Sequence, residues 1–226
     1  IFFAMQATLN EGDEVLIHEP GWLSYQEQIK LVGAIPIFIP YNVEPSDFNK
    51  FFSNNTKMVV INNPNNPAGK VYSSEELQSI YSQCRSKGIY VLVDEAYSDF
   101  VVEDKFCTMA NIAPNKDGVI IVNSLSKNMG MSGWRVGYVI AEKELINEIL
   151  KLNQHIITCA PTILQYYMSE YFEKIISITL PQAQHLVKKR NEVSILLDKL
   201  GLKHMKGSST FYFFMNIEDF PKSSLE

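Results

Sequence analysis

Residues 119–127 read Val-Ile-Ile-Val-Asn-Ser-Leu-Ser-Lys, an apolar run that ends in two hydroxyls and an amine. The apolar part has the length and composition of a buried strand. Ser124, Ser126 and Lys127 therefore lie at the end of that strand, and Arg135 follows eight residues after the lysine. A lysine amine forms Schiff bases, while hydroxyls and a guanidinium are good phosphate ligands. The stretch favours a site for an aldehyde that carries a phosphate.

Two other apolar runs also end in polar residues. One runs into Asn-Asn-Pro-Asn-Asn-Pro-Ala-Gly at residues 62–69, whose prolines and glycine predict a rigid turn. The other ends at Asp94, with Tyr97 three residues further on. Because the carboxyl ends of parallel strands gather along one edge of an open α/β sheet, we expect Asn66, Asp94, Tyr97 and Lys127 to converge.

This combination of side chains suits pyridoxal 5'-phosphate. A buried carboxylate at Asp94 would keep the pyridine nitrogen protonated, since an opposite charge favours the charged form. The amide of Asn66 and the phenol of Tyr97 can form hydrogen bonds to the ring oxygen, and Lys127 can hold the aldehyde. The residues alone therefore predict a cofactor whose electronic properties the protein tunes.

Four motifs in order carry a resemblance to a known family. They are Asn-Pro-x-x-Pro-Ala-Gly at 63–69, Asp-Glu-Ala-Tyr at 94–97, Ser-Leu-Ser-Lys at 124–127 and Gly-Trp-Arg-Val-Gly at 133–137. Over about residues 1–217 the chain resembles the class I/II aminotransferases of the aspartate aminotransferase fold. Each motif lies on the element where that family is expected to have it, so the resemblance is specific.

The resemblance implies a role for each matching residue. Lys127 would form the Schiff base with the cofactor and move the α-proton, with Asp94 and Tyr97 as the other catalytic residues. The implied cofactor-binding set is Trp22, Asn66, Asp94, Tyr97, Ser124, Ser126, Lys127 and Arg135. Within this set the two serines and Arg135 would bind phosphate, and Trp22 would stack on the ring.

Each of these residues also has an ordinary structural interpretation. Trp22 could be a core aromatic, and Asp94 could cap the following helix. Tyr97 could serve only in packing, and Asn66 only in the turn. Arg135 could be a surface cation, although the residues around it predict a buried strand, where an unpaired guanidinium is costly.

The hydrophobic pattern predicts alternating strands and helices, and hence an α/β fold with a mostly parallel sheet and helices on both faces. Six strands are expected, at residues 15–18, 36–39, 58–61, 90–93, 119–122 and 136–141. Ser73 and Glu76 form a capping-box pattern at the start of a helix that Gly88 ends. A second helix is expected between Trp22 and Gly33.

The character of the chain changes after residue 141. Residues 142–200 show helical patterns that should break at Pro161 and Pro181, and residues 210–214 predict a short strand. We expect three parts. A large cofactor-binding domain covers residues 1–145, its helical end and a linking helix cover 146–200, and a small domain begins at 201–226.

Composition excludes several classes of protein. The net charge is −5 and no basic run occurs, so nucleic acid is not expected as a partner. No apolar stretch has membrane-spanning length, and the opening residues lack the charged leader of a signal peptide. Three cysteines without metal-type spacing favour a reduced, cytoplasmic setting, and the four histidines form no ligand-like cluster. No metal site is expected.

The resemblance also implies that the chain is a fragment lacking both ends. An N-terminal arm, one strand, a glycine-rich phosphate loop and a C-terminal arginine for the substrate carboxylate would lie outside it. The chain has only three arginines. Arg85 is on a surface-type helix, Arg135 is assigned to phosphate, and Arg190 lies in a charged run, so none is expected to grip a carboxylate.

The expected reaction is transfer of an amino group from an amino acid to a 2-oxo acid, in a homodimer. Two alternatives stay open. The first is another reaction of the same cofactor and fold, such as that of a β-lyase or a synthase, because a fold does not fix a function. The second is a catalytically silent or regulatory fragment that binds the cofactor.

Overall fold

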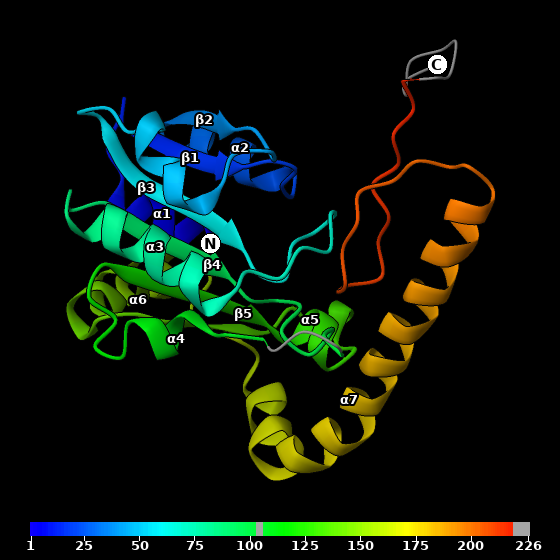
Figure 1. Ribbon diagram of the computed structural model, residues 1–226. Helices are drawn as coiled ribbons and strands as arrows, with labels where there is room; N and C mark the ends of the chain where they lie inside the picture. The colour runs from blue at the N-terminus through cyan, green and yellow to red at the C-terminus, as the bar shows by residue number, and fades with distance from the viewer. Residues whose placement is uncertain (103–105, 219–226) are drawn as a thin grey trace.

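A computed structural model describes residues 1–102 and 106–218, and it shows a six-stranded sheet with helices on both faces (Figure 1). The strands are β1 (Glu14–His18), β2 (Ile35–Ile39), β3 (Thr56–Asn62), β4 (Tyr90–Asp94), β5 (Val119–Ser124) and β6 (Gly137–Ile140). The α-helices are α1 (Phe2–Thr8), α2 (Ser24–Leu31), α3 (Ser74–Arg85), α4 (Met109–Ile112), α5 (Leu125–Asn128), α6 (Lys143–Ile156) and α7 (Thr162–Lys199). Two 3-10 helices are η1 (Pro45–Phe51) and η2 (Ser132–Trp134).

The strand order is β2-β1-β3-β4-β5-β6. The first five strands in this order are parallel, and β6 runs antiparallel to β5. All six expected strands are present, so the prediction of a mostly parallel α/β sheet is confirmed. The parallel order places the carboxyl ends of β1, β3, β4 and β5 at the same edge of the sheet.

The two faces of the sheet are buried by different helices. Along β3, Val59 and Ile61 pack with α3, η1 and α4, while Met58 and Val60 pack with α1, α2 and α6. This alternation follows from the period of two in a strand. It also places Asp94 on the same face as Leu92 of β4, which is the face that α2 covers.

The start of α3 has the expected capping box. The Ser73 hydroxyl accepts from the backbone N–H of Glu76, and the Glu76 carboxylate accepts from the backbone N–H of Ser73. The helix ends at Arg85, and Gly88 follows with a φ of +67°. The predicted bounds of this helix are thus confirmed by the same local chemistry that suggested them.

The helical part after residue 141 departs from expectation at one proline. α6 and α7 are separate, with Pro161 as the residue that precedes α7, but α7 continues through Pro181. The predicted break at Pro181 is therefore wrong. Proline removes one hydrogen bond from a helix, and α7 buries Ala183 and Val187 just beyond that position. Packing on both sides of the proline keeps the helix continuous.

Arg190 is another departure, because it is only 3% exposed rather than part of a solvated charged run. Its guanidinium donates to the backbone carbonyls of Gly207 and Tyr212 and lies 5.0 Å from the ring of Phe213. Burial lowers the pKa of this arginine. Arg190 therefore binds the segment after α7 to the helix. The run of three adjacent cations in the sequence instead predicted an exposed side chain.

The predicted strand at residues 210–214 is also wrong. Within the described part of the chain, this region makes only isolated bridges, between Val101 and Ser209 and between His204 and Met215. Thr210 has a φ of +62°, which interrupts an extended backbone. The expected small domain at 201–226 lies partly outside the described residues, which end at 218, and the three-part division stays a prediction.

In Figure 1, α7 forms a long arm beside the sheet, and the chain after it returns to the carboxyl edge of the strands. There the backbone N–H groups of Ser208 and Ser209 both donate to the carbonyl of Gly69. A Cβ on Gly207 would lie 2.2 Å from the carbonyl oxygen of Ala68. Only glycine permits this close approach of the two segments.

No helix among the described residues is both long and apolar enough to cross a bilayer.

Candidate active site

A cavity of about 840 Å³ lies at the carboxyl ends of β3, β4 and β5. All eight residues predicted for the cofactor line this cavity: Trp22, Asn66, Asp94, Tyr97, Ser124, Ser126, Lys127 and Arg135. They come from five separate stretches of sequence, and the parallel order of the strands brings them together. The convergence that the motifs predicted is therefore present in the structure.

Asp94 is the buried carboxylate of the cavity. Its Oδ2 accepts a hydrogen bond of 2.7 Å from the hydroxyl of Tyr25, and its Oδ1 accepts one of 3.0 Å from the backbone N–H of Ala96. Burial raises the pKa of Asp94, while these two bonds act in the opposite direction. A positively charged ring nitrogen beside Asp94 would favour its ionised form.

Tyr25 is the functional residue that the sequence reading missed. It is 1% exposed, and its ring meets the ring of Trp22 edge-on at 5.3 Å. Burial and the charge of Asp94 raise the pKa of this phenol, so it stays a hydrogen-bond donor. The signal was available, because Trp22 and Tyr25 are three residues apart at the start of a helix and share one face.

Tyr97 lies in the turn after β4 and is buried. Its hydroxyl is 3.0 Å from the hydroxyl of Tyr212, which also lines the cavity. Burial, followed by this hydrogen bond, raises the pKa of Tyr97. The phenol is therefore protonated at neutral pH and can donate to an oxygen in the cavity.

Lys127 projects from α5, the single helical turn that follows β5. The Ser124 hydroxyl caps this turn by accepting from the backbone N–H of Ser126 at 3.1 Å. Lys127 is partly buried, and within the described part of the chain its amine forms no hydrogen bond or ion pair. An amine held in a cavity without a partner is available for a ligand.

Arg135 lies at the outer side of the cavity, and its surroundings differ from the expected buried strand. The residue is exposed, has a φ of +55°, and precedes β6 rather than lying within a strand. Its Nη1 donates to the carbonyl of Ser132 at 2.8 Å and to the hydroxyl of Ser126 at 3.5 Å. The cost of a buried, unpaired guanidinium therefore does not arise, and the side chain can meet an anion from the solvent side.

Asn66 is placed by the turn between β3 and α3. The side chain of Asn62 accepts from the backbone N–H of Asn66 at 2.6 Å and donates to the backbone carbonyl of Asp94 at 3.0 Å. The peptide bonds before Pro64 and Pro67 are cis. Asn62 thus ties the turn that carries Asn66 to the end of β4.

Trp22 forms an open wall of the cavity and is 41% exposed. It is therefore not the core aromatic of the ordinary interpretation. Its only ring contact among the described residues is the edge-on one with Tyr25. One face of the indole is thus available to a flat ligand.

The chemistry of these side chains fits pyridoxal 5'-phosphate. Asp94 offers a buried negative charge to a ring nitrogen, and the phenol of Tyr97, the amide of Asn66 and the amine of Lys127 line the same cavity. The hydroxyls of Ser124 and Ser126 and the guanidinium of Arg135 supply a phosphate site. The fit rests on the buried carboxylate and the unpartnered amine that line the same cavity.

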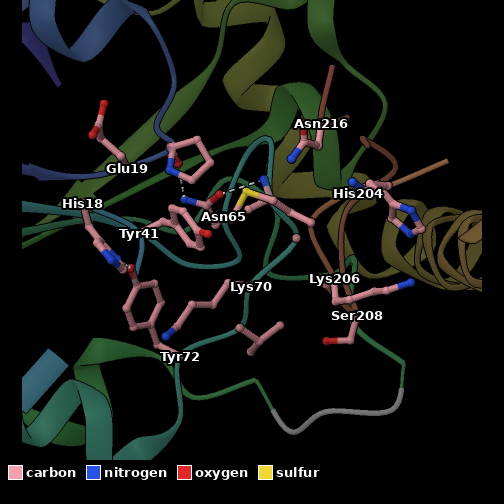
Figure 2. Close-up of a pocket in the computed structure, with 17 residues that line it drawn as sticks. His18, Glu19, Tyr41, Asn65, Lys70, Tyr72, His204, Lys206, Ser208 and Asn216 are labelled. Atoms are coloured by element: carbon pink, nitrogen blue, oxygen red, sulfur yellow. Dashed lines mark hydrogen bonds between the residues drawn. The ribbon is translucent and has the colours of Figure 1, made fainter. Parts of the chain in front are cut away.

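A second cavity, of about 540 Å³, lies beside the first at the ends of β1 and β3 (Figure 2). It is lined by Asn65, the neighbour of Asn66, so the turn at 62–69 separates the two cavities. None of the eight predicted residues lines it. His18 and Tyr72 form a hydrogen bond of 2.5 Å on one side, as Figure 2 shows.

Several polar groups of this second cavity have partners in the protein, although His18 Nε2 has none among the described residues. Lys70 pairs with Glu76 at 2.8 Å, Lys206 pairs with Asp198, and Asn65 donates to the carbonyl of Pro20 at 3.0 Å. The second cavity therefore lies where the sheet meets the segment after α7. The first cavity is the candidate active site.

Comparisons with known proteins agree with this site. The sequence model of the family described as "Aminotransferase class I and II" matches residues 1–222. The chain is 32% identical over 223 residues to an aspartate aminotransferase of Thermotoga maritima, covering 96% of this chain and 58% of that protein. It is 38% identical over 174 residues to a (5-formylfuran-3-yl)methyl phosphate transaminase of Methanocaldococcus jannaschii, covering 77% of this chain and 45% of that protein.

Solved structures show the same likeness. A variant of the Thermus thermophilus aspartate aminotransferase superimposes with a TM-score of 0.92 at 27% identity, covering 99% of this chain and 64% of that chain. The fold is thus the one seen in the solved aspartate aminotransferases. The chain belongs to the class I and II aminotransferase family, and it spans about 58% of the length of the Thermotoga relative.

Proposed function

We propose that the protein is an aminotransferase that uses pyridoxal 5'-phosphate bound at Lys127. The observation that carries the proposal is the pairing of an unpartnered amine with a buried carboxylate across one cavity. Membership of the family supports the class of reaction. Because the chain spans only part of its relatives, the activity is a proposal for the whole protein to which these residues belong.

Each residue of the cavity has a task in this proposal. When bound, pyridoxal phosphate supplies an aldehyde for amines and a ring that accepts electron density from the substrate. Lys127 would hold the aldehyde, and its Nζ would take a proton from the substrate's α-carbon and return it. Asp94 holds the proton on the ring nitrogen, and Tyr97 and Asn66 orient the ring oxygen. Arg135 and the two serines fix the phosphate.

We propose an amino acid and a 2-oxo acid as substrates. The relatives named above include an aspartate aminotransferase and a (5-formylfuran-3-yl)methyl phosphate transaminase. Membership of the family therefore supports amino-group transfer as the reaction without selecting one amino acid.

We also propose a homodimer with the cavity near its interface. Large apolar side chains are exposed around the cavity, among them Trp22, Trp134, Tyr138, Tyr167 and Tyr171. Trp134, Tyr167 and Tyr171 form a continuous row of ring contacts at 5.3 Å and 5.0 Å. Exposed apolar groups of this size are typical of surfaces that bind a protein.

A cytoplasmic location is proposed on the basis of the cysteines. Cys84, Cys107 and Cys159 are all free thiols. Structural disulfides are rare in reducing compartments, so three unpaired cysteines agree with a reducing compartment such as the cytoplasm.

We further propose that the chain divides into three parts, at residues 1–145, 146–200 and 201–226.

The reaction is tested by supplying the protein with pyridoxal phosphate and a panel of amino acids, with and without a 2-oxo acid. An aminotransferase forms the new amino acid and the new 2-oxo acid only when both substrates are present. Release of ammonia and pyruvate without an acceptor would contradict the proposal and indicate a lyase. Lys127→Ala is the control that links any turnover to this cavity.

A further inference from the structure

Two buried asparagines flank the cavity-lining stretch 124–127 in the sequence. Asn123 precedes Ser124, Asn128 follows Lys127, and both are 7% exposed. Asn128 Nδ2 donates to the hydroxyl of Ser98 at 2.9 Å and to Asn123 Oδ1 at 3.2 Å. Asn123 Oδ1 also accepts from the backbone N–H of Ser124 at 2.7 Å. Asn123 also lines the cavity, whereas Asn128 does not and contacts only protein groups.

The same amides reach the turn that carries Tyr97. Ser98, the next residue after Tyr97, accepts from both asparagines, from Asn123 at the longer distance of 3.4 Å. Asn128 Oδ1 accepts from the backbone N–H of Asp99 at 3.3 Å. The turn after β4 and the helical turn after β5 are therefore joined by a buried network of neutral groups.

Asn128 is the centre of this network. Its amide nitrogen and its amide oxygen both have partners, and these partners belong to the turn after β4 and to the end of β5. If any one of these partners were removed, a buried polar group would be left without a hydrogen bond. That costs more free energy than the hydrogen bond itself contributes. The network thus has one arrangement in which all members are satisfied.

We propose that Asn128 is a positioning residue that fixes the Tyr97 turn relative to Lys127. This inference rests on the proposed function, because the distance between these two side chains matters only to a ligand that contacts both. The phenol of Tyr97 and the amine of Lys127 would meet neighbouring groups of the cofactor. A shift of the turn that carries Tyr97 relative to the turn that carries Lys127 would change the distance between the phenol and the group bound to the amine. The effect of the phenol on the pKa of that group would change with it.

Two substitutions separate this role from general stability. Asn128→Leu keeps the volume and removes all bonds of the amide, and Ser98→Ala removes the hydroxyl that joins the turns. Cys84→Ala in α3 is the matched control, since it weakens the core at a buried residue on a different element. The control should lower stability without moving the turns.

The first readout is the pH midpoint of the visible absorption band of the protein loaded with pyridoxal phosphate. We expect Asn128→Leu and Ser98→Ala to shift this midpoint by about half a pH unit or more, and Cys84→Ala to leave it unchanged. Equal midpoints in all four proteins would overturn the inference. Absence of a band in the unsubstituted protein would instead contradict the proposed function.

The second readout needs no cofactor. In the unloaded protein, amide hydrogen exchange at residues 95–99 should be about fivefold faster in Asn128→Leu than in the unsubstituted protein, the factor that one lost hydrogen bond of ~1 kcal/mol gives. Cys84→Ala should not change exchange there relative to the rest of the sheet. Unchanged exchange at 95–99 in Asn128→Leu would overturn the inference whether or not the cofactor binds.

Discussion

At the scale of single residues, the site depends on how Asp94 is kept ionised in a buried position. Its carboxylate has only two protein donors among the described residues, Tyr25 and the backbone of Ala96. Burial acts against the charge, so each donor contributes to the form that a cationic ring requires. This makes Tyr25 as important to the account as the residues that face the cofactor.

Removing the Tyr25 hydroxyl should therefore weaken cofactor binding. In Tyr25→Phe, Oδ2 of Asp94 loses its donor and the pKa of Asp94 rises further, because the bond from Tyr25 lowers it. We expect the dissociation constant for pyridoxal phosphate to rise by about 10-fold or more, the effect of losing one hydrogen bond to a charged group at about 1.5 kcal/mol. A fluorescence titration of the protein with pyridoxal phosphate measures this dissociation constant.

The matched control is Tyr41→Phe, since Tyr41 is 64% exposed and lies at the second cavity. An unchanged dissociation constant in Tyr25→Phe would show that Asp94 does not need this donor.

His18 should make the stability of the fold depend on pH. Burial, followed by the charge of Lys70, lowers its pKa from 6.5 to about 4. Between these two values the unfolded chain binds a proton that the folded chain does not, so the free energy of unfolding rises with pH across this window. The full contribution, on the order of 3 kcal/mol, is present above pH 6.5 and is lost as the pH falls toward 4.

Urea unfolding from pH 4 to 7 checks this expectation when the protein is compared with His18→Gln. For each protein, the slope of the free energy of unfolding against pH is measured, and the difference between the two slopes is the contribution of His18. Asp94 contributes equally to both proteins, and its raised pKa makes the free energy of unfolding change with pH in the opposite direction at the acidic end. Identical slopes would contradict the assignment.

At the scale of elements, the sequence was most informative where local chemistry and periodicity agree. All six strands are apolar runs with clear ends, and the start of α3 is marked by a side chain that satisfies free backbone groups. Pro181 and residues 210–214 were misread because tertiary contacts decide both. The aromatic side chains of Phe211 and Tyr212 contact Tyr97 rather than alternating along a strand.

The capping box of α3 gives a direct test at this scale. Ser73→Ala removes the acceptor for the backbone N–H of Glu76. We expect the free energy of unfolding to fall by about 1 kcal/mol. Ser74→Ala, one position into the same exposed turn, is the control and should change stability by less than about 0.5 kcal/mol. A smaller loss in Ser73→Ala than in Ser74→Ala would reject the capping role.

At the scale of the whole molecule, the arrangement of the site could be predicted and its supports could not. The strand ends of a parallel sheet meet at one edge, so the convergence of Asn66, Asp94, Tyr97 and Lys127 followed from the strand pattern. The other four cavity residues followed from the family resemblance. Tyr25, Asn128 and Arg190 act through contacts with distant parts of the chain. The spacing of Tyr25 from Trp22 indicates only that the two share a helix face, and no local pattern indicates the contacts of Asn128 or Arg190. Arg190 in particular lies beside two lysines that suggest a solvated face.

Arg190 should hold the segment after α7 to the rest of the molecule. Arg190→Met leaves the carbonyls of Gly207 and Tyr212 without this donor, and we expect a loss of about 2–4 kcal/mol in urea unfolding. Arg85→Met is the matched control. Arg85 pairs with Asp117 at a half-exposed position, so its loss should be about 1 kcal/mol or less. Equal losses for the two arginines would contradict the structural role of Arg190.

The most direct test of the central claim is reductive trapping of pyridoxal phosphate on the protein with borohydride, followed by mass spectrometry of the peptides. The account predicts a single pyridoxyl adduct, on Lys127, and none in Lys127→Ala. An adduct spread over surface lysines, or one that persists at the same level in Lys127→Ala, would contradict it.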